Sequence, residues 1–255
     1  MELPELSTTE FGLVGHPLGH SYSKQLFESW HRSYANFDLA ELTPATLYNL
    51  ILLNPRLKGF NVTAPYKESI KPFLDNIDPL ATAVGAVNTV KIRRSDDGRL
   101  LGLDGYNTDY IGFKTSVGQF LDPSFVPMQA LILGTGGAAK AVAAVLKDLG
   151  INFKYVSRTH TGSDTTTYGQ LNDASMSAYG LIINATPLGT YPDTGSYPPI
   201  PYGGITANHK CLDLVYNPTV TEFMKRCAAN GAAVKNGLEM LECQARESLK
   251  IWENQ

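Results

Sequence analysis

A glycine-rich turn between a predicted strand and a predicted helix is the feature that most constrains the fold of this 255-residue chain. The turn reads Gly134-Thr135-Gly136-Gly137-Ala138-Ala139 and follows an apolar run over 129–133. An alanine-rich helix is predicted over 138–149, ended by Gly150, and another strand over 153–156. This order matches G-x-G-x-x-[G/A], which is typical of a dinucleotide-binding domain. For the six residues alone, a purely structural turn is the alternative.

Strand and helix patterns alternate along the whole chain, and this alternation predicts an α/β fold with parallel strands. Upstream of the turn, the patterns predict strands over 11–15, 36–42 and 58–63, helices over 23–34 and 44–53, and a hairpin of 87–93 with 99–103. Downstream, they predict strands over 181–185, 211–216 and 232–235 and helices over 220–230 and 238–253. At about 150 residues per domain, the length favours two modest domains.

The composition disfavours several classes of protein. Lys and Arg number 21 against 24 Asp and Glu, a net charge of −3, and this lack of a basic surplus disfavours a nucleic-acid partner. The longest apolar runs fall far short of the ~20 residues that cross a bilayer, and no signal peptide is recognisable. Cys211, Cys227 and Cys243 fit neither a disulfide framework nor a zinc site. We therefore expect an intracellular, cytoplasmic protein with no bound metal and no membrane partner.

The end of the strand predicted over 153–156 bears on the choice of cofactor. It reads Ser157-Arg158-Thr159, where an NAD site normally carries Asp or Glu for the ribose 2′-hydroxyl. An Arg between two hydroxyls suits a 2′-phosphate instead, because a guanidinium donates charge-assisted hydrogen bonds to phosphate. The pattern favours NADP over NAD, and a solvated surface Arg is the alternative.

Short polar motifs occur throughout the first half of the chain. Ser21 and Ser23 lie where a helix is predicted to begin, so their hydroxyls can bind a carboxylate there or serve as an ordinary N-cap. Asn61 and Thr63 alternate on a predicted strand and point to one face of it. Because buried polar groups need partners, a bound polyol is a candidate ligand for that face.

Further polar motifs stand at the ends of predicted strands, where open α/β sheets bind ligands. They are Pro65-Tyr66-Lys67, Gly85-Ala86-Val87-Asn88-Thr89 and the run 105–112, which contains Asp109. Each one can be a capped turn with Asn or Asp. That all of them are such turns is a weaker explanation than one shared site.

Taken together, short pieces from almost the whole chain form one ordered set. They are Gly15-His16-Pro17, His20-Ser21-Tyr22-Ser23, Asn61-Val62-Thr63 to Lys67, Gly85-Ala86-Val87-Asn88-Thr89, Asn107-Thr108-Asp109, Gly134-Thr135-Gly136-Gly137-Ala138, Asn184-Ala185-Thr186-Pro187-Leu188-Gly189, Asp213-Leu214-Val215-Tyr216-Asn217-Pro218-Thr219 and Gly237-Leu238-Glu239-Met240-Leu241 to Gln244. The set resembles the shikimate dehydrogenase family, which includes quinate/shikimate dehydrogenases. The resemblance extends from about Phe11 to Trp252.

The resemblance implies the NADP-dependent, reversible reduction of 3-dehydroshikimate to shikimate, a step towards chorismate and the aromatic amino acids. It also implies two domains with the active site between them. Residues 1–113 would form the substrate-binding domain, completed by the C-terminal helix 237–255, and residues 114–236 a Rossmann-like NADP-binding domain. We expect the partner to be a small-molecule substrate, and we expect the protein to be a monomer or a homodimer.

The same match assigns roles to individual residues. Lys67 and Asp109 form the catalytic pair, and the substrate carboxylate is bound by Ser21 and Ser23. The substrate hydroxyls are bound by Asn61, Thr63, Asn88, Asp109 and Gln244, and Tyr216 lies near the carboxylate and the nicotinamide. The cofactor-binding residues are Gly134, Thr135, Gly136, Gly137, Ala138, Ser157, Arg158, Thr159, Thr186 and Gly237.

The chain departs from the family pattern in several places. Lys24 and Ser157 stand where the family usually has Pro and Asn, and Thr161-Gly162-Ser163 lacks the usual second basic residue, which weakens the expected selectivity for NADP. A quinate dehydrogenase is one alternative, and a shikimate-type pair of small serines argues against it. A nucleotide-binding regulatory module without turnover is another, and the presence of both Lys67 and Asp109 argues against that.

Overall fold

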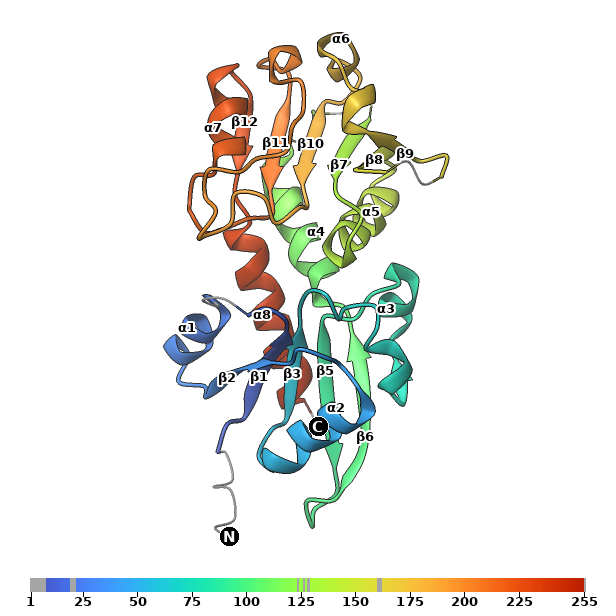
Figure 1. Ribbon diagram of the computed structural model, residues 1–255, viewed down its shortest axis with the longest axis vertical. Coiled ribbons are helices and arrows are strands. Elements are labelled where there is room, and N and C mark those ends of the chain that lie inside the picture. Colours follow the sequence, from blue (N-terminus) through green and yellow to red (C-terminus); the bar gives the residue numbers. More distant parts are fainter. Residues whose placement is uncertain are drawn as a thin grey trace. The chain divides into compact units, whose positions relative to one another are not determined.

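The computed structural model of the protein describes residues 8–18, 22–122, 124–125, 127, 129–159 and 162–254. The chain divides into two compact units, Met1–Thr108 together with Gln244–Gln255, and Asp109–Cys243 (Figure 1). Each unit contains a six-stranded sheet with helices packed against it. The predicted α/β class is therefore confirmed.

The sheet of the first unit has the strand order β2-β1-β3-β5-β6-β4. Its strands are β1 (Phe11–Gly15), β2 (Tyr34–Asp38), β3 (Gly59–Val62), β4 (Asn76–Ile77), β5 (Thr89–Arg94) and β6 (Leu100–Tyr106). β1 pairs in parallel with β2 and β3, whereas β5 is antiparallel to β3 and β6. The predicted hairpin between β5 and β6 is confirmed, with Gly98 in the left-handed region that glycine favours.

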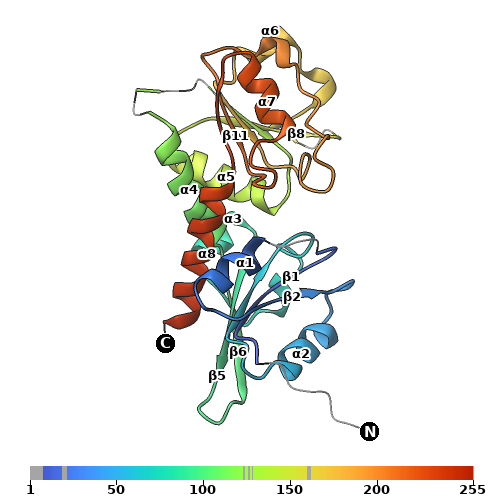
Figure 2. The same cartoon turned by 90° about the vertical axis from the view of Figure 1, so that its left-hand side faces the viewer.

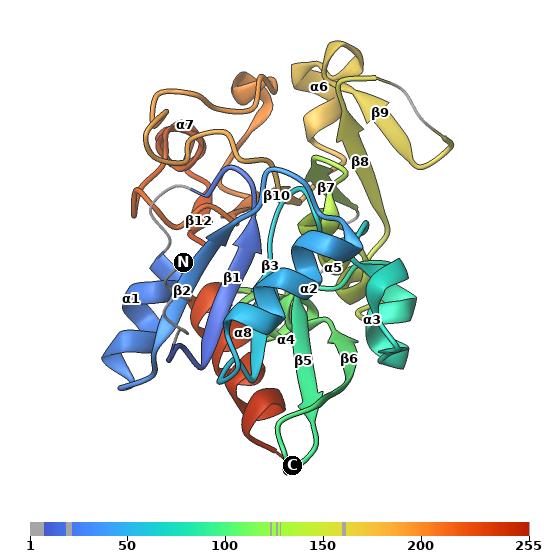
Figure 3. The ribbon, with the colours of Figure 1, turned by 60° about the horizontal axis from the view of Figure 1, so that its bottom comes forward.

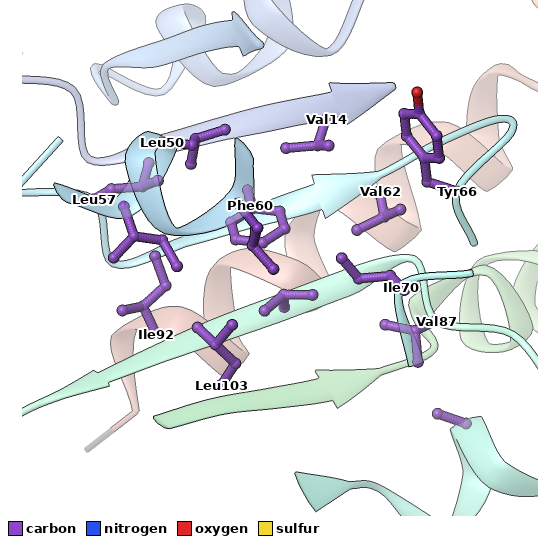
Figure 4. Close-up of a cluster of buried hydrophobic side chains, with 14 residues drawn as sticks. Val14, Leu50, Leu57, Phe60, Val62, Tyr66, Ile70, Val87, Ile92 and Leu103 are labelled. Atoms are coloured by element: carbon purple, nitrogen blue, oxygen red, sulfur yellow. The ribbon is translucent and has the colours of Figure 1, made fainter. Parts of the chain in front are cut away.

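Helix α2 (Pro44–Leu53) covers one face of this sheet (Figure 3). It begins at the predicted residue, because Thr43 forms a capping box with Thr46 and Pro44 stands at its first position. Beneath α2 lies a core of buried side chains from α2, β1, β3, β5, β6 and the adjoining turns (Figure 4). The labelled members are Val14, Leu50, Leu57, Phe60, Val62, Tyr66, Ile70, Val87, Ile92 and Leu103. The remaining helices of this unit are α1 (Tyr22–Ser29) and α3 (Pro79–Val84).

The opposite face of the sheet is covered by the C-terminal part of α8 (Leu238–Glu253). Trp252 stacks on Phe11 with ring centroids 4.8 Å apart, and its indole Nε1 donates to the Val90 carbonyl at 2.9 Å. A Cβ at Gly59 would lie 2.2 Å from Trp252 Nε1. Only glycine at this position therefore lets the indole approach the strand.

The second unit has an entirely parallel sheet with the strand order β12-β11-β10-β7-β8-β9. Its strands are β7 (Ala130–Leu133), β8 (Phe153–Ser157), β9 (Thr165–Thr167), β10 (Leu181–Asn184), β11 (Lys210–Asp213) and β12 (Ala233–Lys235). Counted from β7, this is the order 3-2-1-4-5-6 of dinucleotide-binding sheets, and the order reverses between β7 and β10. Ligands bind at such a switch point, beyond the carboxyl ends of the strands.

Helices flank the second sheet (Figure 2). They are α4 (Thr108–Phe120), α5 (Gly137–Asp148), α6 (Asp173–Met176) and α7 (Glu222–Ala229). The crossovers through α5 and α7 run in opposite directions along the sheet, so their right-handed sense places these two helices on opposite faces. The core on the α7 side joins Phe223 and Cys227 to Leu131 and Ile182.

Several predictions of secondary structure are wrong in their bounds or incomplete. The strand expected over 36–42 spans Tyr34–Asp38, and α3, α6, β4 and β9 were not predicted. The first helix ends at Ser29 rather than residue 34, because His31 takes a positive φ of 57° and β2 already begins at Tyr34. The strand expected over 211–216 ends at Asp213, since its carboxylate takes the Val215 N–H. The helix α4 was not predicted at all.

None of the helices within the described residues is long and apolar enough to cross a membrane. Cys211, Cys227 and Cys243 form no disulfide with one another, and the first two are buried. The described part of the chain contains no group of three or more His, Cys, Asp or Glu that could hold a metal ion.

Candidate substrate and cofactor sites

A buried network of side-chain amides and hydroxyls lies in the first unit, where β3, β5 and the start of α4 meet α8. Asn88, only 2% exposed, links its parts. Its Oδ1 accepts the Thr108 N–H at 2.7 Å, and its Nδ2 donates to Gln244 Oε1 at 3.4 Å. Two residues predicted to bind the substrate, Asn88 and Gln244, are thus in direct contact.

Asn61 joins the same network from β3. Its Nδ2 donates to Ser248 Oγ at 2.9 Å and to Thr89 Oγ1 at 3.1 Å, and its Oδ1 accepts the Tyr34 hydroxyl at 2.9 Å. Because both ends of the amide are held, its orientation is fixed. The structure therefore brings together Asn61, Asn88 and Gln244, which lie far apart in the sequence.

Three hydroxyl groups in the network were not assigned a role from the sequence. The Oγ atoms of Thr89, Thr108 and Ser248 lie 2.9–3.1 Å from one another. The spacing of Ser248 could have indicated its role from the sequence. It lies four residues after Gln244 and four before Trp252, on the apolar face of the last helix. A polar residue on such a face requires a partner.

The other predicted substrate and catalytic residues lie in several elements. Thr63 directly follows β3, and its N–H donates to the Val14 carbonyl at 2.9 Å. Lys67 is half-buried in the next turn, where its carbonyl accepts the Val87 N–H at 2.8 Å. Asp109 is buried in the first turn of α4, next to Thr108. Ser23 is buried at the second position of α1, whereas Ser21 lies outside the described residues.

The glycine-rich turn directly follows β7 at the switch point of the second sheet. Gly134 has a φ of +107°, and a Cβ on it would lie 3.2 Å from Thr186 Cγ2. Gly136 is the N-cap of α5 and no side chain of the described residues caps it. A Cβ added to Gly136 would meet no described atom within 4 Å. No side chain of the described residues therefore occupies the N-cap position of α5, which suits the binding of a pyrophosphate by its first backbone N–H groups.

Ser157 and Arg158 lie at the carboxyl end of β8, next to this turn in the sheet. The Ser157 hydroxyl accepts the Thr159 N–H at 3.1 Å, which bends the chain after the strand. Arg158 is exposed, and no carboxylate of the described residues forms an ion pair with it. Its guanidinium is thus available to a phosphate group.

Three further predicted residues follow β10, β11 and β12. The Thr186 hydroxyl donates to Asn184 Oδ1 at 2.6 Å. A Cβ on Gly237 would lie 2.1 Å from the Leu214 carbonyl oxygen, so only glycine fits there. Tyr216 is half-buried, and this burial raises the pKa of its phenol above the ordinary value.

The strand order and the uncapped glycine turn define a dinucleotide-binding unit, and the buried amides define a second unit suited to a polyol. Such a pair of units is the architecture of a nucleotide-dependent oxidoreductase. Residues 13–90 match the model of the shikimate dehydrogenase substrate binding domain. The NADP(+) shikimate dehydrogenase of Carboxydothermus hydrogenoformans is 34% identical over 261 residues, which cover 94% of this chain and 90% of the relative.

Solved structures agree with this match. Shikimate dehydrogenase 1 from Peptoclostridium difficile is 35% identical with a TM-score of 0.78, over 96% of this chain and 91% of that one. Shikimate 5-dehydrogenase from Thermus thermophilus, solved with NADP(H) and shikimate, is 30% identical with a TM-score of 0.75, over 96% and 93%. The chain belongs to the shikimate dehydrogenase family.

Proposed function

We propose that this protein catalyses the reversible, NADP-dependent reduction of 3-dehydroshikimate to shikimate. It is an oxidoreductase that acts on a CH–OH group, in the pathway to chorismate and the aromatic amino acids. The observation that carries the proposal is the identity of 34% with an NADP(+) shikimate dehydrogenase over 94% of the chain. The buried amide network and the uncapped glycine turn support it independently.

The chemistry needs a proton donor at the substrate carbonyl. NADPH, when bound, supplies the hydride that reaches the carbonyl carbon. The Lys67 ammonium then donates a proton to the carbonyl oxygen as the C–O bond becomes single, and in the oxidation direction the amine of Lys67 takes the proton from the hydroxyl. Asp109 holds a neighbouring substrate hydroxyl and orients Lys67.

The remaining assignments follow the match residue by residue. Ser21 and Ser23 bind the substrate carboxylate, and Asn61, Thr63, Asn88 and Gln244 bind its hydroxyls, with Tyr216 beside the carboxylate and the nicotinamide. Residues 1–113 and 237–255 form the substrate domain, and residues 114–236 the NADP domain. Amides held by protein partners lose little freedom when they bind a polyol, which favours binding.

The cofactor is NADP, bound by the glycine turn 134–138, Thr186 and Gly237. Ser157, Arg158 and Thr159 recognise its 2′-phosphate, since Arg158 is exposed and no acid stands at the end of β8. We propose further that the enzyme works in the cytoplasm as a monomer or homodimer. The net charge of −3 supports the absence of a nucleic-acid partner.

One assay tests the proposed function. Purified protein is mixed with 3-dehydroshikimate and NADPH, and the loss of NADPH absorbance is followed. We expect turnover with 3-dehydroshikimate and, in reverse, with shikimate and NADP⁺. If the protein oxidises quinate faster than shikimate, quinate and not shikimate is its substrate. If it binds NADPH without any turnover, the result favours a regulatory module.

A further inference from the structure

Asp213 is a fully buried carboxylate at the carboxyl end of β11 that the proposed reaction does not use. Its Oδ1 accepts the Asn184 Nδ2–H at 2.9 Å and the Val215 N–H at 3.0 Å, and its Oδ2 accepts the Thr221 hydroxyl at 2.5 Å. All three donors are uncharged, so burial raises the pKa of Asp213 to about 6. Keeping a carboxylate in such surroundings lowers stability relative to a neutral group.

The partners of Asp213 lead to two predicted cofactor-binding residues, Thr186 and Gly237, and to Tyr216, which is predicted to lie near the substrate carboxylate and the nicotinamide. Asn184, which donates to Asp213, accepts both the N–H and the hydroxyl of Thr186 at 3.1 and 2.6 Å. Val215, whose N–H is also bound by Asp213, accepts the Gly237 N–H on its carbonyl at 3.1 Å. Tyr216 is the next residue after Val215. One side chain thus connects the loops that follow β10, β11 and β12.

An amide in place of the carboxylate cannot reproduce these contacts. The two carboxylate oxygens accept three hydrogen bonds from separate segments, whereas an asparagine has one acceptor oxygen and a nitrogen that only donates. With asparagine, the amide nitrogen would face either the pair of donors at the Oδ1 position, or the Thr221 hydroxyl, which would then have to turn, accept from the amide and give up its own donated bond. The loops would then lose the connection that sets their relative positions.

We propose that Asp213 is a positioning residue that holds Thr186, Tyr216 and Gly237 in the geometry required to bind NADP. The inference rests on the proposed function for the roles of those three residues. It assigns Asp213 no contact with cofactor or substrate. The carboxylate acts through Asn184 and through the Val215 backbone.

The test compares Asp213→Asn with a control on the same strand. His209 directly precedes β11, is 4% exposed, and anchors the opposite end of the strand through Thr206 N–H and the Met176 carbonyl. His209→Gln therefore disturbs a buried polar anchor of the same strand away from the predicted site. Kd for NADP⁺ is measured by calorimetric titration, and the melting temperature of each variant is recorded.

We expect Asp213→Asn to raise Kd for NADP⁺ about ten- to hundredfold, as expected for lost hydrogen bonds to a charged group. His209→Gln should lower the melting temperature yet leave Kd within about twofold of wild type. An unchanged Kd in Asp213→Asn, or an equal rise in His209→Gln, would overturn the inference. In either case the Asp213 side chain would contribute to the stability of the protein and would have no specific effect on NADP⁺ binding.

A second pair of variants applies if Asp213→Asn does not fold. Thr221→Val removes the donor to Oδ2 and also the hydroxyl that caps α7 by accepting the Met224 N–H, whereas Thr221→Ser keeps both contacts. The valine variant should weaken NADP⁺ binding about tenfold and the serine variant should restore most of it. Equal affinities for the two would contradict the proposal. A wild-type protein that binds NADP⁺ but does not oxidise shikimate would contradict the proposed function while leaving these Kd comparisons interpretable.

Discussion

Replacing Ser248 with alanine tests whether the buried network stabilises the first unit and orients its amides. The hydroxyl is fully buried, with Asn61 Nδ2 and Thr89 Oγ1 at 2.9 Å and Thr108 Oγ1 at 3.1 Å. Removing it leaves these groups short of a partner, which costs about 1–3 kcal/mol. Alanine in place of serine within a helix returns roughly 0.5 kcal/mol. The expected loss of unfolding free energy is therefore about 0.5–2.5 kcal/mol.

Ser116 provides a matched control for this variant. It is also fully buried and also lies on a helix, α4, but its hydroxyl has no hydrogen-bond partner among the described residues. Ser116→Ala deletes the same atom without breaking a contact, so it should be neutral or stabilise by roughly 0.5 kcal/mol. The difference between the two variants isolates the network from burial and helix propensity.

Scanning calorimetry measures the effect on stability, because two units can unfold in separate transitions. A change of 1 kcal/mol shifts the melting temperature of a domain by about 4–8 °C for 60–100 residues and less for larger domains. Ser248→Ala should also raise KM for shikimate at least about threefold, since Asn61 loses a partner that fixes its amide. If the Ser248→Ala transition of the first unit falls relative to wild type by no more than the Ser116→Ala transition of the second unit does, and KM stays at the wild-type value, the network neither stabilises the unit nor orients the site.

Three further predictions concern the cofactor, the substrate carboxylate and pH. Arg158→Ala should raise KM for NADP at least about tenfold and leave KM for NAD nearly unchanged; equal losses for both cofactors in parallel assays would exclude a 2′-phosphate contact. Ser21→Ala and Ser23→Ala should each raise KM for shikimate without changing Kd for NADP⁺, and an unchanged KM in a folded variant would show that this serine does not bind the carboxylate. The pKa of Asp213 is raised from 3.8 to about 6 in the folded protein. Between these two pH values Asp213 is protonated in the folded state and ionised in the unfolded state, so the free energy of unfolding falls as pH rises through that window. Wild type should therefore lose unfolding free energy relative to Asp213→Asn between about pH 4 and 6, and parallel unfolding curves would contradict the burial of an ionised Asp213.

Local signals in the sequence were enough to predict several elements. β1 (Phe11–Gly15), α2 (Pro44–Leu53) and α8 (Leu238–Glu253) begin and end at the predicted residues. In α2 the cap, the first-turn proline and the apolar residues are all within the segment itself. The glycine turn was likewise recognisable, because its strand and helix are its direct neighbours in the chain.

Some missed features depend on partners distant in the sequence, whereas α3 was missed although its Asp78 cap and Pro79 are local signals. α4 contains Gly112 and Gly118, which weaken its helical pattern, and its N-terminal N–H at Thr108 is bound by Asn88, 20 residues earlier. The early end of β11 has a local cause instead, because the side chain of Asp213 accepts the N–H of Val215 two residues later. The contacts of Asn61 and Asn88 with the last helix were also beyond any local pattern.

The measurement that tests the central claim most directly is kcat for Lys67→Ala with saturating shikimate and NADP⁺. Loss of a group that transfers a proton in the rate-determining chemistry lowers the rate by about 10²–10⁴. We therefore predict that kcat falls at least about a hundredfold, while Kd for NADP⁺ and the melting temperature stay close to wild type. A variant that retains more than about a tenth of the wild-type kcat would contradict the assignment of proton transfer to Lys67.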